Sequence, residues 1–168
     1  MNKAKTGPDL GYSAAVIEHF QNPRNVGRIE NPDGLGRIVN PVCGDVTELY
    51  LKVRDGVVEA ATFQSLGCAV TIASASVFTE KIKGRKISEL LAGKDEEVVG
   101  RLVGLIEGEL GELPQQKLHC PPATVQAFLE AIEKQTEKEG QTELAARVRA
   151  LLPKVQGYYQ RGAEKEPD

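Results

Sequence analysis

The spacing of apolar residues changes along the chain, from the alternation of a strand to the longer period of a helix. In the stretch 46–54, Leu49, Leu51 and Val53 alternate with tyrosine, lysine and arginine, which is typical of a strand with two different faces. The Asp55-Gly56 pair that follows is a tight hairpin turn. We therefore predict a small antiparallel sheet with strands over residues 37–40, 46–54 and 57–64.

After residue 68 the apolar residues recur at helical spacing. The segment 71–83 is rich in alanine and serine, so its helix can lie close against the sheet. Pro153 is expected to stop or kink the last helix, and residues 31–36 and 108–118 are predicted as turn and linker. The predicted helices cover residues 13–21, 71–83, 88–92, 95–106, a segment that follows Cys120, and 142–152.

The first predicted helix has a start signal and an apolar face. Ser13 is a candidate N-cap, and Val16, Ile17 and Phe20 fall on one side of the helix. His19, beside Phe20, is interpreted as a structural or surface residue and not as a ligand.

Length, composition and charge exclude several classes of protein. With 168 residues, of which 40% are hydrophobic and 27% charged, the chain is typical of a globular domain with room for a real core. The formal charge is -3 without a lysine- and arginine-rich stripe, which argues against a nucleic-acid partner. No apolar run approaches the roughly 20 residues that span a bilayer, and residues 1–9 lack the apolar stretch of a signal peptide. The cytoplasm is the expected location.

The three cysteines carry the strongest chemical signal. An odd number without a secretion signal disfavours a disulfide framework and favours metal or redox chemistry. Cys43, Cys68 and Cys120 all fall at the ends of predicted elements, where ligands are more common than structural cysteines. Cys68 and Cys120 also lie near helix starts, where unpaired N–H groups and the helix dipole are expected to lower a thiol pKa.

Two further donors stand beside these cysteines. Asp45 follows Cys43 after one glycine, which permits a tight backbone that would turn both side chains toward one point. His119 is adjacent to Cys120, and in a bend before a helix both could reach one metal ion. Cysteine, aspartate and histidine are zinc ligands, and thiolates also bind iron–sulfur clusters. Buried structural cysteines, an Asp45 that only caps a turn, and a solvated His119 are the open alternatives.

Four short motifs follow one another along residues 12–134. Residues 17–27 read IEHFQNPRNVG, residues 40–45 read NPVCGD, residues 67–76 read GCAVTIASAS and residues 117–120 read KLHC. In this order they resemble the U-type iron–sulfur cluster assembly scaffolds, the family of IscU, the NifU N-terminal domain and SufU. The histidine beside the third cysteine makes the chain most similar to the IscU/NifU branch.

The resemblance implies a fold and a set of site residues. The fold is α+β, a small three-stranded antiparallel sheet packed against several helices as in IscU and SufE, here with an extra C-terminal helix. The three cysteines match those that receive sulfur and bind a cluster, and the aspartate matches one linked to cluster lability or zinc ligation. The implied metal ligands are Cys43, Asp45, Cys68, His119 and Cys120, with Lys117 as an auxiliary residue.

The resemblance also implies a function that is not enzymatic. Members of the family assemble [2Fe-2S] clusters from iron and from sulfur that a cysteine desulfurase supplies, and transfer them to apo iron–sulfur proteins. An Hsp70-type chaperone system serves many members. Zinc is the other metal that such a site would hold in the protein as isolated. We expect a monomer or weak homo-oligomer, with neither nucleic acid nor a membrane as a partner.

The chain departs from the family pattern at three points. Residues 113–117 read LPQQK where many members have LPPVK, the segment that the chaperone recognises. Pro121 and Pro122 follow the third cysteine in place of serine, and Ala69 replaces a common glycine. The expected organisation is a flexible tail over residues 1–11, a scaffold domain over 12–134, and a C-terminal helical extension over 135–168 that ends in a disordered tail from residue 162.

Three other functions stay open. The first is a zinc-dependent sulfur acceptor that stimulates a cysteine desulfurase. The second is a structural zinc protein, in which the metal only ties loops to the core. The third is a cysteine hydrolase that uses Cys120 and His119, although neighbours in sequence rarely form a nucleophile–base pair.

Overall fold

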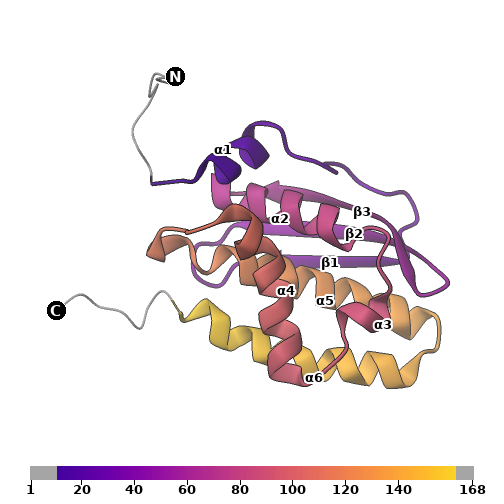
Figure 1. The fold of residues 1–168 in the computed structure, drawn as a ribbon. Helices are drawn as coiled ribbons and strands as arrows, with labels where there is room; N and C mark the ends of the chain where they lie inside the picture. Colours follow the sequence, from indigo (N-terminus) through magenta and orange to yellow (C-terminus); the bar gives the residue numbers. More distant parts are fainter. Residues whose placement is uncertain (1–10, 162–168) are drawn as a thin grey trace.

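The computed structural model describes residues 11–161 and has the α+β fold that the sequence predicts (Figure 1). Strands β1 (Gly34–Val39), β2 (Val46–Arg54) and β3 (Val57–Leu66) form an antiparallel sheet in the order β1-β2-β3. The helices of this described part are α1 (Ala14–Gln21), α2 (Ala69–Ile82), α3 (Ile87–Leu90), α4 (Asp95–Leu110), α5 (Cys120–Lys138) and α6 (Thr142–Tyr159), with a 3-10 turn η1 (Gln115–Lys117). None of them is long and apolar enough to cross a membrane.

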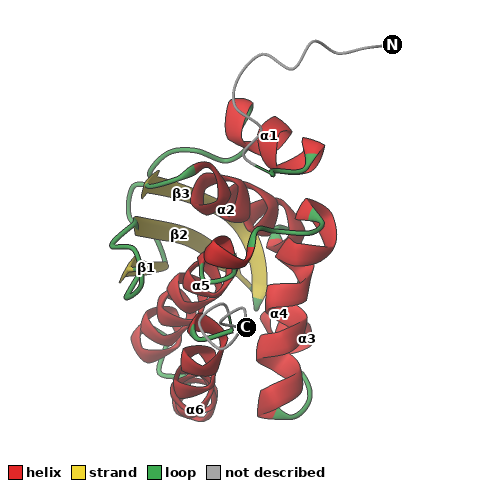
Figure 2. Cartoon of the chain, turned by 90° about the vertical axis from the view of Figure 1, so that its left-hand side faces the viewer, coloured by secondary structure: helices red, strands yellow, loops and turns green. Residues whose placement is uncertain are grey.

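The helices are stacked on one face of the sheet (Figure 2). Helix α2 lies against β3, α5 lies against β1 and β2, and α6 forms an outer layer on α5 and α4. Gly36, Leu49 and Phe63 are paired across the three strands, and Leu49 and Phe63 are buried under the helices. The alternation predicted for residues 46–54 is therefore the alternation between a helix-covered and an open face.

Two glycines allow β1 to lie directly on the backbone of α5. A side-chain carbon at Gly34 would overlap the carbonyl oxygen of Ala131, and one at Gly36 would overlap that of Ala127. Only glycine fits where a strand backbone approaches a helix backbone this closely. The contact therefore sets the position of α5, which begins at Cys120, relative to the strand that leads to Cys43.

The first helix starts as predicted but buries a different face. Ser13 caps α1, since its Oγ accepts the Val16 N–H at 3.1 Å. Val16 is buried, whereas Ile17 and Phe20, expected on the same buried face, are 45% and 44% exposed. The second inward residue of α1 is His19, so the predicted apolar face is wrong while the structural interpretation of His19 is confirmed.

His19 joins α1 to α2 as a neutral ring. The Ser76 hydroxyl accepts the Arg24 N–H at 2.9 Å, which leaves its own proton free to be donated to His19 Nδ1 at 2.8 Å. Burial is the main cause that lowers the pKa of His19, and the Arg24 guanidinium adds to it, against the opposite effects of Glu80 and Glu109. The neutral ring is the form that can accept the hydroxyl proton.

Protonation of His19 is expected to destabilise the fold in mild acid. Its pKa lies lower in the folded chain than in the unfolded chain, where it is about 6.5. The unfolded chain therefore takes up the proton first, and the free energy of unfolding decreases as the pH falls through that value. Urea titrations from pH 7 to pH 5.5 should show a shallower decrease for His19→Gln, which keeps a polar side chain but does not titrate. Equal slopes for the two proteins would contradict this account.

The largest differences from the prediction lie at three places. Strand β1 begins at Gly34, inside the stretch predicted as a turn, because its backbone is supported by α5. Helix α4 continues to Leu110 instead of ending at residue 106. Helix α6 passes through Pro153, which was expected to stop or kink it. Val155 and Tyr159 beyond this proline are buried, and their packing outweighs the missing backbone donor.

The C-terminal extension is continuous with the rest of the fold. Helix α5 runs through residue 134, the expected end of the scaffold domain, as far as Lys138. Leu151 and Val155 of α6 are fully buried in the shared apolar core. Residues 1–10 of the flexible tail expected over residues 1–11, and the disordered tail expected from residue 162, lie outside the described residues.

Candidate metal centre

All three cysteines lie at the end of the sheet opposite the β2–β3 turn. Cys43 is in the loop between β1 and β2, Cys68 is the N-cap residue of α2, and Cys120 is the first residue of α5. The last residue of β1, the first of β2 and the last of β3 are paired across the sheet. The loops that carry Cys43 and Cys68 therefore leave the sheet next to each other, at the same end.

Cys68 and Cys120 form a close pair of thiols. Their Sγ atoms are 3.9 Å apart, and Thr71 Oγ1 is 3.5 Å from Cys68 Sγ. A hydrogen bond from the Cys120 thiol lowers the pKa of Cys68 to about 5, in the direction predicted for a helix start. The same hydrogen bond, together with burial, raises the pKa of Cys120. The lowered pKa predicted for Cys120 is therefore wrong, because only one thiol of the pair can give up its proton easily.

At mildly acidic pH, Cys68 is expected to be the reactive thiol of the metal-free protein. A pKa of about 5 makes it a thiolate at pH 6. Cys43 is exposed as a residue, but partial burial of its thiol raises the pKa of that group, which stays protonated. Alkylation of each cysteine, followed by mass spectrometry between pH 4 and pH 9, should reach half its final rate near pH 5 for Cys68 alone. Cys43 is the internal control for accessibility. A half-point for Cys68 above pH 8 would rule this assignment out.

Asp45 is turned toward the start of α2. Its Oδ2 accepts the Thr71 hydroxyl at 2.8 Å and the Cys68 N–H at 3.1 Å. Gly44 has a φ of 79°, which supplies the predicted tight turn. A side-chain carbon at Gly67 would lie 2.6 Å from Asp45 Oδ2, so glycine leaves the space for the carboxylate. Burial acts to raise the pKa of Asp45, but these hydrogen bonds outweigh it and lower the pKa.

His119 is buried at the N-cap of α5 and is held by a residue that sequence analysis did not single out. Its side chain is 7% exposed, which excludes the alternative of a solvated loop histidine. Its Nδ1 lies 3.0 Å from Asn40 Nδ2 and 3.8 Å from Cys120 Sγ. Asn40 is 2% exposed. The only hint of this role in the sequence was that Asn40 is a polar residue at the end of a predicted strand, beside the loop of the first cysteine.

Lys117, predicted as an auxiliary residue, lies in η1 close to Cys68. Burial acts to lower the pKa of its ammonium group, but the attractions of Cys68, Tyr12 and Cys120 together outweigh burial and raise the pKa. Lys117 therefore supplies a positive charge next to the paired thiols.

The predicted ligands share one end of the molecule without forming a closed cage. Across residues 11–161, no three side chains of histidine, cysteine, aspartate or glutamate are close enough to hold a metal ion as they stand. Cys68 is instead engaged with Cys120, and Asp45 with Thr71. A metal ion would have to exchange these contacts for coordination. Thiolate, carboxylate and imidazole donors are nevertheless the types that zinc and iron–sulfur clusters accept.

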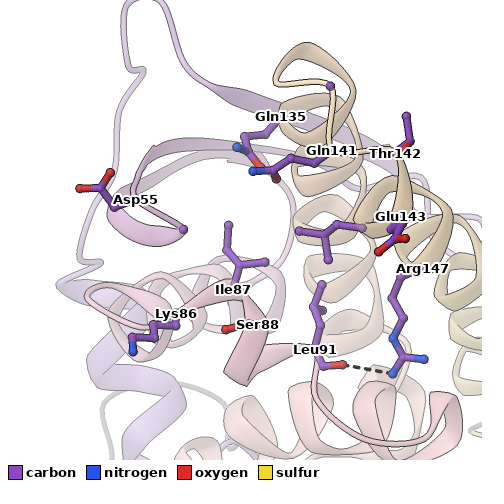
Figure 3. Close-up of a pocket in the computed structure, with 13 residues that line it drawn as sticks. Asp55, Lys86, Ile87, Ser88, Leu91, Gln135, Gln141, Thr142, Glu143 and Arg147 are labelled. Carbon is purple, nitrogen blue, oxygen red and sulfur yellow. Dashed lines mark hydrogen bonds between the residues drawn. The ribbon is translucent and has the colours of Figure 1, made fainter.

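The pocket in Figure 3 lies at the other end of the sheet. It has a volume of about 780 Å³ and is lined by the Asp55-Gly56 turn, by α3 and by the start of α6. Arg147 closes one side of it with hydrogen bonds to the Leu91 carbonyl at 3.1 Å and to Asp95 at 2.6 Å. Its lining contains none of the predicted ligands, so the pocket is separate from the thiols.

Comparison with known proteins identifies the family. The family model described as the NifU-like N-terminal domain matches residues 11–142. The chain belongs to this family. An iron–sulfur cluster assembly scaffold protein IscU of Archaeoglobus fulgidus is 43% identical to this NifU-like chain over 129 residues, which cover 77% of the chain and 79% of that protein. The IscU scaffold of Escherichia coli K12 is 39% identical over 127 residues, or 73% and 92% of the two chains.

A solved structure has the same fold as this NifU-like chain. It is the protein from Fervidobacterium islandicum AW-1 that is described as an assembly scaffold for the SUF system. The TM-score is 0.57 at 22% sequence identity, and the match covers 75% of this chain and 99% of that one. The likeness supports the α+β architecture, and the predicted resemblance to the U-type scaffold family is confirmed by the family match.

Proposed function

We propose that this NifU-like chain is a scaffold on which iron–sulfur clusters are assembled and from which they are passed to apoproteins. The observation that carries the proposal is that the thiols of Cys68 and Cys120 lie 3.9 Å apart, while Asp45 accepts the Cys68 N–H through its carboxylate and donates its own backbone N–H to Cys43 Sγ. Relatives named as IscU assembly scaffolds, at 38–43% identity, support it. We further propose that it works in the cytoplasm.

The proposed set of ligands is suited to a cluster that has to be released. Three thiolates and a carboxylate hold a [2Fe-2S] cluster less completely than four thiolates do. Cys43 is exposed, Cys68 half-buried and Cys120 buried, so one side of the proposed site is open to a partner. Lys117, beside Cys68, would offset part of the negative charge of thiolate-bound cargo.

Exposed apolar side chains next to the thiol loops are consistent with a protein that delivers sulfur. Val39, Val42 and Leu66 are 53%, 58% and 79% exposed, and they flank the loops of Cys43 and Cys68. Such groups of apolar side chains are typical of protein-binding surfaces. The partner we propose is a cysteine desulfurase. A scaffold thiolate would attack its persulfide, forming a new S–S bond and releasing the desulfurase thiolate.

An Hsp70-type chaperone is not part of the proposal. Leu113, the first residue of the segment that the chaperone reads in other members, is 8% exposed and packs in the core. Gln115 and Gln116 are exposed in place of the usual proline and valine. A chaperone would have to draw Leu113 out of the core before binding this segment.

The oligomeric state, a monomer or a weak homo-oligomer, stays a prediction. Light scattering would test it.

One observation favours the zinc-dependent sulfur acceptor as a second candidate. Because His119 Nδ1 is engaged with Asn40, the donors left for a metal ion are the three thiols and Asp45. Zinc accepts such a four-ligand set. In this role the metal would hold the thiols, and one of them would accept sulfur.

Anaerobic reconstitution separates the two candidates. The protein is incubated with a cysteine desulfurase, cysteine and ferrous iron, and its visible spectrum is recorded. A sulfide-to-iron charge-transfer band that can be passed to an apo-ferredoxin is expected for the scaffold, and Cys68→Ala should lose it. Tightly bound zinc, no cluster and faster desulfurase turnover would favour the sulfur acceptor instead.

A further inference from the structure

Helix α5 begins with a carbonyl group that the helix itself cannot satisfy. Leu118 and His119 already have helical backbone angles, and Cys120 is the first residue of the helix. At helical angles, the Leu118 carbonyl would accept the N–H of the third or fourth residue after it. Those residues are Pro121 and Pro122, and neither has an N–H to donate. The donor for the Leu118 carbonyl, two residues before Cys120, therefore has to come from outside the helix.

The C-terminal extension supplies this donor. Helix α6 runs back along α5 toward the end where α5 begins (Figure 1), and Arg161 follows its last turn. Arg161 Nη2 donates to the Leu118 carbonyl at 3.3 Å and to Glu107 Oε1 at 2.6 Å. The side chains of Arg161 and Glu107 are only 32% and 28% exposed, so their ion pair is partly shielded from water. One guanidinium thus ties α4 to the loop before Cys120.

The end of α6 is fixed against both neighbouring helices. A side-chain carbon at Gly100 of α4 would lie 2.9 Å from the Tyr158 hydroxyl oxygen, so glycine leaves room for that ring. The next residue, Tyr159, is 6% exposed and donates its hydroxyl to Gln126 of α5. The Arg161 Cζ atom lies 4.9 Å from the centre of the Tyr158 ring, a cation–π contact that orients the guanidinium. Arg161 therefore reaches the loop from a fixed base.

We propose that Arg161 is a positioning residue, which takes the place of the N–H that Pro122 lacks and so holds the loop that carries Cys120. The inference rests on the proposed function, because it gives the position of Cys120 its importance. With the loop held, Cys120 stays 1% exposed and 3.9 Å from Cys68, measured between the Sγ atoms. Without Arg161, the start of α5 should fray and expose the third thiol. The C-terminal extension then serves the thiols without contributing a residue that touches them.

Hydrogen exchange and alkylation of the metal-free protein test the proposal. In Arg161→Ala, the amide hydrogens of residues 117–120 should exchange on the order of tenfold faster, and iodoacetamide should modify Cys120 faster by a similar factor. Arg149→Ala is the matched control. It removes an arginine of the same helix, whose ion pair with Glu137 is half-exposed, and it should leave both rates unchanged. Amides of β2 report the opening of the whole fold, and their rates should change less than those of the loop.

A second substitution separates this role from general destabilisation. Pro122→Ala restores an N–H that can donate to the Leu118 carbonyl. Combined with Arg161→Ala, it should return exchange and alkylation toward the rates of the parent, and alone it should match the parent. Unchanged rates in a folded Arg161→Ala, equal acceleration in β2 and the loop, or no rescue in the double variant would each overturn the proposal.

Cluster reconstitution links the inference to the proposed function. Arg161→Ala should form the charge-transfer band on the order of tenfold more slowly than the parent, whereas Arg149→Ala should keep the rate of the parent. If the parent itself forms no cluster, the proposed function fails. Exchange and alkylation need no metal ion, so they still decide whether Arg161 holds the loop.

Discussion

Replacement of Gly36 by alanine is expected to lower the free energy of unfolding by about 3 kcal/mol or more. The new methyl group would overlap the carbonyl oxygen of Ala127, which belongs to the backbone of α5 and cannot rotate away. Strand β1 and helix α5 would have to separate, and the core between them would lose contacts. For a chain of this size, the expected fall in Tm is roughly 6–12 °C.

Urea and thermal unfolding followed by circular dichroism would measure this effect. Gly104→Ala is the matched control, because nothing lies within 4 Å of a side-chain carbon added at this position in α4. That control should gain about 0.5–1 kcal/mol from the higher helix propensity of alanine. If Gly36→Ala were as stable as the parent, the direct backbone contact between β1 and α5 would be disproved.

Asp45→Ala is expected to make a bound cluster more persistent, with transfer to an apo-ferredoxin slowed on the order of tenfold. The parent carboxylate lies beside Cys68, held by Thr71, and stays ionised because its pKa is lowered. It offers an oxygen donor that cluster iron binds weakly and a negative charge that repels thiolate-bound cargo. Alanine removes both effects and leaves the three thiols unchanged.

The decay of the visible charge-transfer band and the rate of transfer would measure this second effect. Glu59→Ala removes an equal charge from an exposed position on β3 and should behave like the parent. Faster transfer or faster decay in Asp45→Ala would show that Asp45 retains the cluster, and the role given to it here would be wrong.

Local patterns along the chain were enough to predict much of the fold. The alternation in β2 and the Asp55-Gly56 turn predicted both ends of that strand. The start of β1 was missed because Gly34 and Gly36 have low strand propensity, and only their contact with α5 explains them. The passage of α6 through Pro153 was missed for a similar reason. In both places a contact between distant segments outweighs local preference.

The residue types of the candidate site could be predicted from the sequence, but the hydrogen bonds between them could not. Cysteine positions at element ends, with Asp45 and His119 beside them, pointed to one patch. The bonds from Asn40 to His119 and from Thr71 to Asp45 join residues far apart in sequence, so no local motif announces them. The raised pKa of Cys120 follows from its neighbour Cys68 and from burial, which a helix-start argument leaves out.

The contact of β1 with α5 also bears on the order of events during synthesis. Cys43 and Cys68 are translated early, but the helix that carries Cys120 packs on β1 only after residues 127–131 have been made. A nascent chain shorter than this has two thiols without their third. Because the site depends on contacts between distant segments, it is completed late in folding. Incomplete chains on the ribosome would therefore bind iron and sulfide poorly.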